Sequence, residues 1–216
     1  MKPAPPVTTA RTGPYRRFEV FVTFEGLDGS GKTTQAELLA DALRGDGQEV
    51  VATREPGGTP LGEQVRELLL NGRDMSAWAE AALFAAARAE LVEKVIGPAL
   101  EQGRHVVCDR YVDSSLAYQG IARGLGVERV LQLNEHAIRG LLPDRTFLVL
   151  VDPATAAARA RSSDRIESEG EDFHRTVDRA YRELATMFFD RIVTVDGDRQ
   201  PDQIAEEIRG RIRQLS

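Results

Sequence analysis

The chain has 216 residues, a formal net charge of −6 and 42% hydrophobic residues. This length suits one domain, and the apolar content is too high for a disordered chain. The mild acidity argues against a general nucleic-acid binder, which usually carries a basic surface. No apolar run approaches the roughly 20 residues that span a bilayer, and the single cysteine, Cys108, fits a reducing compartment. We therefore expect a cytoplasmic protein with no membrane or nucleic-acid partner.

The first 17 residues differ in character from the rest of the chain. They contain four prolines and a glycine, and they lack the apolar region of a secretory signal. We expect residues 1–17 to form a flexible tail. Its basic residues could contact an anionic partner, although a solvated leader is the simpler interpretation. Residues 18–216 are then expected to form a single domain.

From residue 18 onward, short apolar runs alternate with longer segments of helical periodicity. In chain order, the predicted elements are a strand at 18–24, a helix at 32–43, a strand at 49–53, helices at 61–70 and 77–100, a strand at 105–108, helices at 113–122 and 127–139, a strand at 146–151, helices at 154–161 and 173–189, a strand at 192–195 and a helix at 201–214. Pro98 is expected to stop or kink the helix that contains it.

This alternation predicts an α/β fold, in which a five-stranded parallel sheet carries helices on both faces. Right-handed crossovers bring the loops that follow the strands to one edge of the sheet, where ligands bind. The most polar internal segment, at about 159–172, is interpreted either as a solvated helix end or as a mobile lid.

The sequence GLDGSGKT follows the first predicted strand, opens a helix and matches the pattern G-x-x-x-x-G-K-[ST]. Its glycines let the backbone wrap tightly and aim N–H groups inward, and the helix N-terminus adds partial positive charge. Lys32 would reach the β- and γ-phosphates, and the Thr33 hydroxyl could ligate Mg²⁺. Because motif and context agree, we expect a nucleoside triphosphate site rather than an accidental glycine-rich turn, formed by Gly26, Leu27, Asp28, Gly29, Ser30, Gly31, Lys32 and Thr33.

The other half of the metal site is expected at the end of a neighbouring strand. Asp109 closes the apolar run HVVC and could bind Mg²⁺ directly or through water. A lone aspartate at such a place is often only a helix cap. Arg110 follows it at once, however, and this favours a functional role for the pair.

Five strings along the chain resemble motifs of the thymidylate kinase family, in the family's order. They are EGLDGSGKTTQ at 25–35, TREPGGTPLGEQVRELLL at 53–70, LFAAARAELVEKVIGPAL at 83–100, DRYVDSSLAYQG at 109–120 and DRIESEGEDFHRT at 164–176. The resemblance covers nearly the whole chain from residue 18. It implies a P-loop nucleoside monophosphate kinase architecture with a short lid, and transfer of the γ-phosphoryl of ATP to dTMP to form dTDP and ADP. It also implies Mg²⁺ as cofactor and a homodimer.

The resemblance further implies a site for the acceptor. At the positions of Arg54 and Arg110 the family holds the dTMP phosphate, and guanidinium forks suit phosphate oxygens geometrically. Phe84 would stack on thymine, although it could equally be a core phenylalanine. Arg88 lies one helical turn later and is similar to the arginine that hydrogen-bonds the thymine carbonyl. Without the resemblance, a surface salt bridge would be the simpler interpretation of Arg88.

Other positions complete the implied acceptor site. Tyr118 would crowd the 2′ position and favour deoxyribose, and Asp28 resembles the carboxylate that contacts the 3′-hydroxyl and a phosphate-binding arginine. The full implied dTMP set is Asp28, Arg54, Phe84, Arg88, Arg110, Ser115, Tyr118 and Gln119.

An acceptor phosphate that is already anionic needs no strong base, so catalysis should consist of positioning and charge neutralisation. Some family members carry an arginine at the position of Gly29, and this chain does not. Other members supply the arginine from the lid instead, and this chain has Arg159, Arg161 and Arg165 there. We therefore predict that the lid supplies a catalytic arginine, Arg161 or Arg165, and that Arg159 packs against adenine. The expected catalytic set is Lys32, Asp28, Asp109, Arg110, Arg161 and Arg165.

Two other classes of protein remain as alternatives. Another P-loop nucleoside monophosphate or small-molecule kinase would share the P-loop, but REPGGT together with DRY…AYQG is not expected there. A non-enzymatic regulator such as a GTPase switch would need N-K-x-D, which the sequence lacks. A binding-only relative would have lost Lys32, Asp109 or the arginines. Cys108 is expected to be buried and inert, and the three histidines are interpreted as structural or surface residues.

Overall fold

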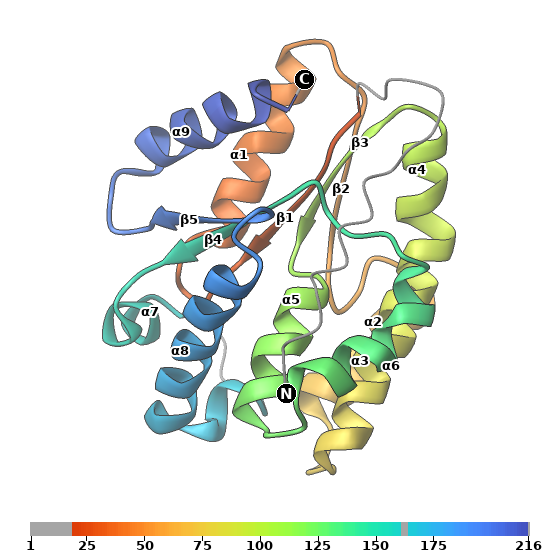
Figure 1. Cartoon of the computed structure of the whole chain (residues 1–216), viewed down its shortest axis with the longest axis vertical. Helices are drawn as coiled ribbons and strands as arrows, with labels where there is room; N and C mark the ends of the chain where they lie inside the picture. Colours follow the sequence, from red (N-terminus) through yellow and green to blue (C-terminus); the bar gives the residue numbers. More distant parts are fainter. Residues whose placement is uncertain (1–18, 161–163, 216) are drawn as a thin grey trace.

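A computed structural model describes residues 19–160 and 164–215 and shows a parallel five-stranded sheet in the order β2–β3–β1–β4–β5 (Figure 1). The strands are β1 (Phe21–Glu25), β2 (Val50–Arg54), β3 (His105–Asp109), β4 (Arg145–Leu150) and β5 (Ile192–Asp196). Every neighbouring pair of these strands is parallel, so the expected α/β fold is confirmed. The expected tail, residues 1–17, lies outside the described residues.

Helices connect the strands, as parallel crossovers require. They are α1 (Lys32–Gly45), α2 (Pro60–Asn71), α3 (Ala77–Leu91), α4 (Gly97–Glu101), α5 (Val112–Ser115), α6 (Val127–Ile138), α7 (Pro153–Arg159), α8 (Glu171–Met187) and α9 (Pro201–Arg213). The π-helical segments η1 (Val92–Ile96) and η2 (Leu116–Ala122) continue α3 and α5, and a 3₁₀ turn, η3 (Glu167–Glu169), precedes α8. Across the part of the chain that the structure describes, no helix is both long and apolar enough to cross a membrane.

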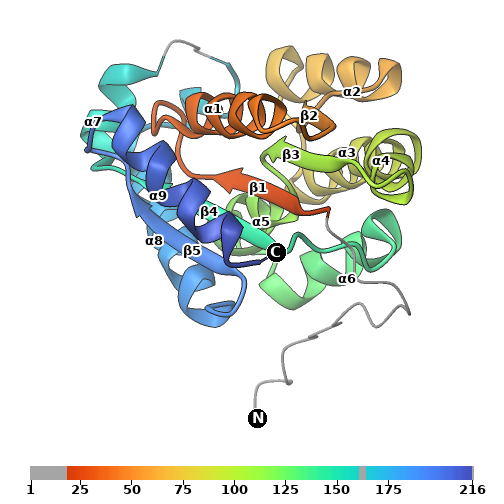
Figure 2. The ribbon, with the colours of Figure 1, turned by 90° about the horizontal axis from the view of Figure 1, so that it is seen from above.

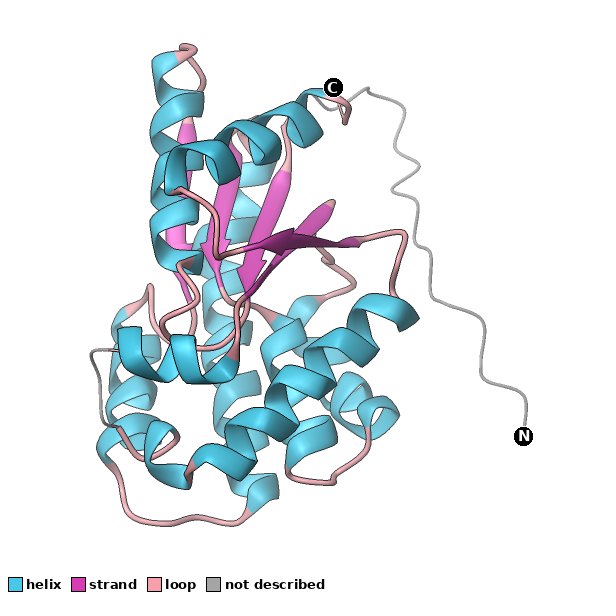
Figure 3. Cartoon of the chain, turned by 90° about the vertical axis from the view of Figure 1, so that its left-hand side faces the viewer, coloured by secondary structure: helices cyan, strands magenta, loops and turns pink. Residues whose placement is uncertain are grey.

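Helices cover both faces of the sheet (Figures 2 and 3). On one face α1 packs against α9, and Leu39 and Ile208 from these helices share a core cluster with Phe24 and Phe147. On the other face Phe21 joins a separate cluster with residues of η1 and α4. Strand β1 is buried at every position, as expected for the central strand of a sheet that is covered on both sides.

The helix that contains Pro98 changes its hydrogen-bond pattern just before the proline. α3 runs into the π-helical segment η1, and the helix then continues through α4 to Glu101. A proline has no N–H to donate, and its ring clashes with the carbonyl four residues earlier in an α-helix. The π-helical turn, in which the Gly97 N–H bonds to the Val92 carbonyl, accommodates both effects just before Pro98. The helix thus ends at Glu101, within one turn of Pro98 and one residue beyond the predicted end at residue 100.

The loops that follow the strands meet at one edge of the sheet. Strand β1 lies between β3 and β4, and its register pairs Phe24 with both Asp109 and Phe147. Gly26 opens the loop after β1 with a φ of +141°, and a Cβ there would lie 2.5 Å from the Val149 carbonyl oxygen. Only glycine lets the chain turn so close to β4, and this turn brings the loop beside the end of β3.

Candidate active site

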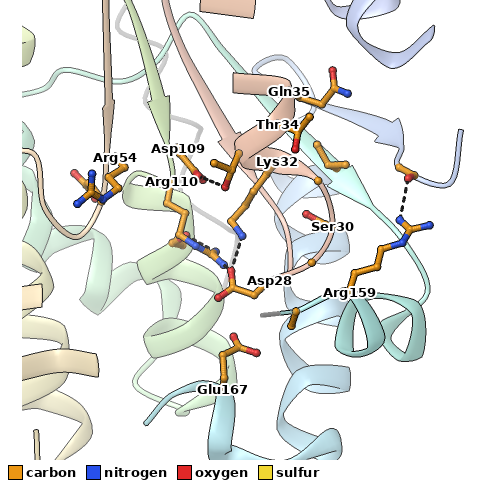
Figure 4. Close-up of a pocket in the computed structure, with 18 of the residues that line it drawn as sticks. Asp28, Ser30, Lys32, Thr34, Gln35, Arg54, Asp109, Arg110, Arg159 and Glu167 are labelled. Carbon is orange, nitrogen blue, oxygen red and sulfur yellow. Dashed lines mark hydrogen bonds and ion pairs between the residues drawn. The ribbon is translucent and has the colours of Figure 1, made fainter. Parts of the chain in front are cut away.

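A cavity of about 1190 Å³ lies along this edge of the sheet. Residues 28–35, from the loop after β1 and the start of α1, line its centre. Figure 4 shows Arg54 and Arg159 on opposite sides of Lys32, and both arginines line the cavity. Side chains that are far apart in the sequence therefore face one continuous space.

Lys32 begins α1 and is buried at the centre of the cavity wall. Its ammonium group donates to Asp28 Oδ1 at 2.5 Å and to the Leu27 carbonyl oxygen at 3.3 Å. Burial lowers the pKa of Lys32, and the charge of Arg110 lowers it further against the opposing effect of Asp28. The first N–H groups of a helix lack partners within it, and no side chain caps α1. This helix end therefore offers hydrogen-bond donors and a cation to an anionic ligand.

Arg110 follows β3 and has a φ of +68°, a left-handed conformation that costs a residue other than glycine about 1–2 kcal/mol. Its guanidinium group donates to Asp28, to Ser114 Oγ at 3.2 Å and to the Tyr181 hydroxyl at 3.1 Å. Burial alone would raise the pKa of Asp28, but the charges of Arg110 and Lys32 hold it well below its usual range. A strained backbone that several contacts hold in place is typical of functional positions.

Thr33 and Asp109 lie side by side beneath the loop. The Thr33 hydroxyl donates to Asp109 Oδ2 at 2.5 Å, and Asp109 Oδ1 is buried without a hydrogen-bond partner among the described residues. Hydroxyl and carboxylate oxygens are ligands that Mg²⁺ prefers, usually one or two from the protein with phosphates and water completing the shell. Residues 19–160 and 164–215 contain no cluster of three or more His, Cys, Asp or Glu that could hold a metal alone. The donor set therefore fits Mg²⁺ that arrives with a phosphate ligand.

A fully buried carboxylate, Glu25, supports this site from below. Its Oε1 accepts from the backbone N–H groups of Tyr111 (2.8 Å) and Ser114 (3.2 Å), and its Oε2 accepts from the Ser114 hydroxyl (2.6 Å) and the Tyr181 hydroxyl (2.8 Å). Burial, and next the charge of Asp113, raise the pKa of Glu25 to about 7. These hydrogen bonds fix the chain immediately after the strained arginine.

Phe84 from α3 and Tyr118 and Gln119 from η2 line the part of the cavity next to Arg110. The Arg110 guanidinium carbon lies 5.5 Å from the centroid of the Tyr118 ring, and the Tyr118 hydroxyl is buried with no hydrogen-bond partner in the described part of the chain. Arg54 extends from the end of β2, with 52% of its side chain exposed, and pairs with a glutamate of α2 at 2.9 Å. Aromatic walls beside guanidinium groups suit a planar ligand that carries an anionic group.

Arg88 is fully buried and does not line the cavity. Its Nε donates to Glu55 at 2.8 Å, its Nη1 donates to Ser115 Oγ at 3.1 Å and to Asn134 Oδ1, and its Nη2 donates to the Tyr111 carbonyl at 3.1 Å. Nη2 also lies 2.6 Å from Glu55 Oε2. An arginine has five N–H donors, so each of them is already directed at a protein acceptor.

The remaining predicted arginines are Arg159, Arg161 and Arg165. Arg159 lines the cavity, and its Nη1 donates to a carbonyl of the loop between β5 and α9 at 3.4 Å. Arg165 does not line the cavity: its Nε donates to a carbonyl of α2 at 2.9 Å and its Nη2 donates to Glu80 at 2.7 Å. Arg161 lies outside the described residues.

Comparisons with known proteins agree with this arrangement. A family model described as thymidylate kinase matches residues 24–208. Curated thymidylate kinases of Synechococcus sp. strain JA-3-3Ab and Symbiobacterium thermophilum are 49% and 46% identical to this chain, over 88% and 91% of it and 93% and 94% of their own lengths. The crystal structure of thymidylate kinase from Ehrlichia chaffeensis has 35% identity and a TM-score of 0.75, and the match covers 90% of this chain and 98% of that one.

The chain belongs to the thymidylate kinase family. Most of the residues predicted for the site of a thymidylate kinase line the cavity, namely Asp28, Gly29, Ser30, Gly31, Lys32, Thr33, Arg54, Phe84, Asp109, Arg110, Tyr118, Gln119 and Arg159. The predicted residues that do not line it are Gly26, Leu27, Arg88, Ser115 and Arg165.

Gly29, the position at which some family members carry an arginine, lies against the backbone of α7. The residue has a φ of +83°, and a Cβ there would lie 2.1 Å from the Ala156 carbonyl oxygen and 2.9 Å from the Ala160 nitrogen. The backbone of α7 thus approaches the loop so closely that it leaves no room for a side chain at this position.

Sequence reasoning assigned no role to several residues at or below the cavity. Glu167 lines the cavity, and Figure 4 shows its carboxylate facing Asp28 from below. Burial, followed by the negative charge of Asp28, raises the pKa of Glu167 to about 7. Glu25 and Glu167 both lie inside strings that carry the family resemblance, but only the folded chain shows what their side chains contact. Glu80 lies in no such string.

Proposed function

We propose that this chain is an ATP-dependent dTMP kinase, which transfers the γ-phosphoryl of ATP to dTMP and releases dTDP and ADP. One observation carries the proposal: the P-loop with Lys32 and the aromatic pocket with Phe84 and Arg110 line the same cavity. A phosphoryl donor and a nucleotide acceptor bound in these two places would have their phosphates adjacent, as direct transfer requires.

Charge neutralisation by preformed cations is the proposed source of catalysis. Lys32 would bind the β- and γ-phosphates, and Arg110 would bind the acceptor phosphate and the moving phosphoryl group. Both cations form ion pairs with Asp28 in this structure. When phosphates bind, their oxygens would take the place of the Asp28 carboxylate as the partner of Lys32 and Arg110. No base is needed, because the attacking oxygen belongs to an anionic phosphate.

We also propose that Thr33 and Asp109 hold Mg²⁺ together with phosphate oxygens. The unpartnered Asp109 Oδ1 supports this assignment, because a buried carboxylate oxygen is costly unless it finds a donor or a cation. When bound, the ion would neutralise charge on the β- and γ-phosphates. Addition of a chelator is expected to abolish transfer, and full activity without a divalent cation would refute the assignment.

The acceptor pocket is proposed to bind thymine between apolar walls. Phe84 would stack on the base, Arg54 and Arg110 would hold the phosphate, Tyr118 would lie beneath the 2′ carbon, and Gln119 and Ser115 would border the base. Arg88 can reach the thymine carbonyl only by exchanging one of its present protein acceptors. Ser115 Oγ, at 3.1 Å, is one of the three uncharged acceptors that such an exchange could release.

Residues at about 159–172 are proposed to form the lid. Arg159 already borders the part of the cavity formed by the loop between β5 and α9, and this supports packing against adenine. A catalytic role for Arg165 would require it to leave Glu80. Arg161 stays a prediction as the other lid arginine.

We propose a homodimer on the basis of the family resemblance. We also propose that residues 18–216 form a single domain and that the protein is located in the cytoplasm. Leu61, Leu68 and Trp78 from α2 and α3 are 44%, 54% and 44% exposed, and a dimer interface would bury such apolar side chains. Light scattering at micromolar concentration tests this proposal, and a monomer mass would refute it.

The decisive experiment is a coupled assay of ADP release with ATP·Mg²⁺ and a panel of dTMP, dUMP, UMP, dCMP, AMP and shikimate. We expect the highest turnover with dTMP, its loss in Lys32→Ala and a reduced rate in Arg88→Ala. Equal turnover with AMP, or no turnover with dTMP, would refute dTMP as the specific acceptor. The chain would then be a P-loop kinase that acts on another class of acceptor.

A further inference from the structure

Glu80, in the first turn of α3, collects hydrogen bonds from two separate parts of the chain. Its Oε1 accepts from Gln119 Nε2 at 2.8 Å and from Arg123 Nε at 3.3 Å. Its Oε2 accepts from Arg165 Nη2 at 2.7 Å and from Arg123 Nη2 at 3.2 Å. Glu80 is 1% exposed, yet it does not line the cavity. A buried carboxylate outside the site thus connects the acceptor pocket with the lid.

The charge of Glu80 is well compensated where it lies. Burial alone would raise the pKa of this carboxyl group, but hydrogen bonds from Gln119, Arg165 and Arg123 lower it below its ordinary value. Glu80 is therefore an anion at neutral pH. An ionised carboxylate only accepts hydrogen bonds, so it dictates which atoms of its neighbours face it.

This constraint determines the orientation of the Gln119 side chain. The amide NH₂ must face Glu80, because the opposite orientation would place two acceptors together. The amide oxygen of Gln119 is then directed away from Glu80 and can accept a hydrogen bond from a ligand. Gln119 lines the cavity, and its one side-chain hydrogen bond among the described residues is the one donated to Glu80. An acceptor oxygen at this place matches a pyrimidine that carries an N3–H, and it opposes cytosine, whose N3 is an acceptor.

The same carboxylate anchors the lid near its return to α8. Arg165 also donates its backbone N–H to the Leu70 carbonyl at 2.9 Å, and Arg123 donates to Glu169 at 2.5 Å. The Arg123 guanidinium carbon lies 4.6 Å from the centroid of the Phe173 ring. These contacts dock residues 164–169 against α2, α3 and η2, and this docking sets Glu167 at the cavity wall.

We propose that Glu80 is a positioning residue of the acceptor site, which turns the Gln119 amide oxygen toward the base and anchors Arg165 so that the lid segment lies beside it. The inference rests on the proposed function, because it takes the acceptor to be a pyrimidine nucleoside monophosphate. Glu80 touches neither substrate. Its effect is therefore on the affinity and selectivity for the acceptor, and not on the binding of ATP.

Glu80→Gln tests the proposal, because it keeps the shape of the side chain and removes the charge. A glutamine can donate to Gln119, so the Gln119 amide is free to turn over, and Arg165 loses its anionic partner. We expect the KM for dTMP to rise about tenfold, since one oriented hydrogen bond is at stake. The ratio of kcat/KM for dTMP over dCMP should fall by a similar factor, and the KM for ATP should stay within about twofold. Glu90→Gln, on the same helix, is the matched control.

A double variant separates positioning from general loosening of the fold. In a Gln119→Ala background, Glu80→Gln should change the dTMP over dCMP ratio by less than twofold, because its target is gone. If Glu80→Gln does not fold, Glu80→Asp takes its place: the shorter carboxylate retracts from Gln119, and the selectivity ratio should again fall severalfold.

The outcomes are distinct. Wild-type protein without dTMP turnover would refute the proposed function itself. Wild-type turnover combined with an unchanged KM for dTMP and an unchanged selectivity ratio in the Glu80 variant would refute the inference alone. So would equal rises in the KM values for dTMP and ATP, or full additivity of the two substitutions.

Discussion

Replacement of Glu25 by glutamine should remove a pH-dependent contribution to the stability of the fold. Glu25 is fully buried beneath the active site, and burial is the largest cause that raises its pKa from 4.5 to about 7. Glutamine has nearly the same shape. It can keep an oxygen toward the N–H groups of Tyr111 and Ser114 while its NH₂ donates to the hydroxyls that now donate to Glu25.

The sign follows from the raised pKa. The folded protein keeps the Glu25 proton at pH values where the unfolded chain has already lost it, so the unfolded state binds fewer protons. The contribution is complete below pH 4.5 and is lost as the pH rises from 4.5 to about 7. At about 1.4 kcal/mol per pH unit, this difference corresponds to roughly 3 kcal/mol.

Urea unfolding of wild type and Glu25→Gln between pH 4.5 and 8 measures this contribution. The free energy of unfolding of the variant minus that of wild type should rise by roughly 3 kcal/mol between pH 4.5 and 8. Any pH-independent loss of stability caused by glutamine does not affect this change. Glu37→Gln, on the exposed face of α1, is the control. A relative stability that is flat within about 0.5 kcal/mol would show that Glu25 is ionised throughout, and the reasoning would fail.

Three further predictions concern other parts of the site. Lys32→Ala should lower kcat about 10²–10³-fold while dTMP still raises the Tm, and a loss below tenfold would contradict its role. Gly29→Ala should cost about 1–3 kcal/mol more than Gly31→Ala, since both have positive φ but only Gly29 meets α7, whereas a Cβ at Gly31 has nothing within 4 Å. Equal melting temperatures would contradict this. Arg191→Ala should lower the free energy of unfolding by about 3–5 kcal/mol in urea unfolding, because it leaves the fully buried Asp113 carboxylate without its cationic partner. A loss below about 1 kcal/mol would show that this ion pair contributes little to stability.

The sheet and the phosphate loop could be predicted because their signals are local. Five apolar runs correspond to the five strands, and the glycine pattern after the first run specifies a turn that needs positive φ. Asp109 was predicted to share a metal site with Thr33 because it ends an apolar strand next to Arg110, and the structure shows the two side chains in contact. Cys108 was expected to be buried and inert, and it is fully buried with a pKa well above its usual value because of burial.

The surroundings of the arginines could not be read from the sequence. Arg88 is enclosed because Glu55, from the loop after β2, and Asn134, from α6, reach it across the fold. Arg165 turns to Glu80 because α3 passes beneath the lid. Spacing along one helix cannot reveal partners that other elements supply. Arg88 and Arg165 therefore face buried protein acceptors in this structure, and the roles predicted for them toward dTMP and the phosphoryl group stay predictions.

The arrangement of charges at the active site is unfavourable for the stability of the fold. Asp28, Lys32 and Arg110 form a cluster of charges in a largely buried loop, and such clusters seldom add stability, because desolvation offsets their attraction. Arg110 adds backbone strain. What the arrangement supplies is geometry: the two cations are held by one carboxylate before any phosphate arrives. Because a preorganised charge need not reorient during the reaction, it stabilises the transition state more than a mobile one. The same logic extends outward, since Glu25 fixes the chain after Arg110 and Glu80 fixes Gln119. Anions outside the reacting centre thus determine how its polar groups are oriented.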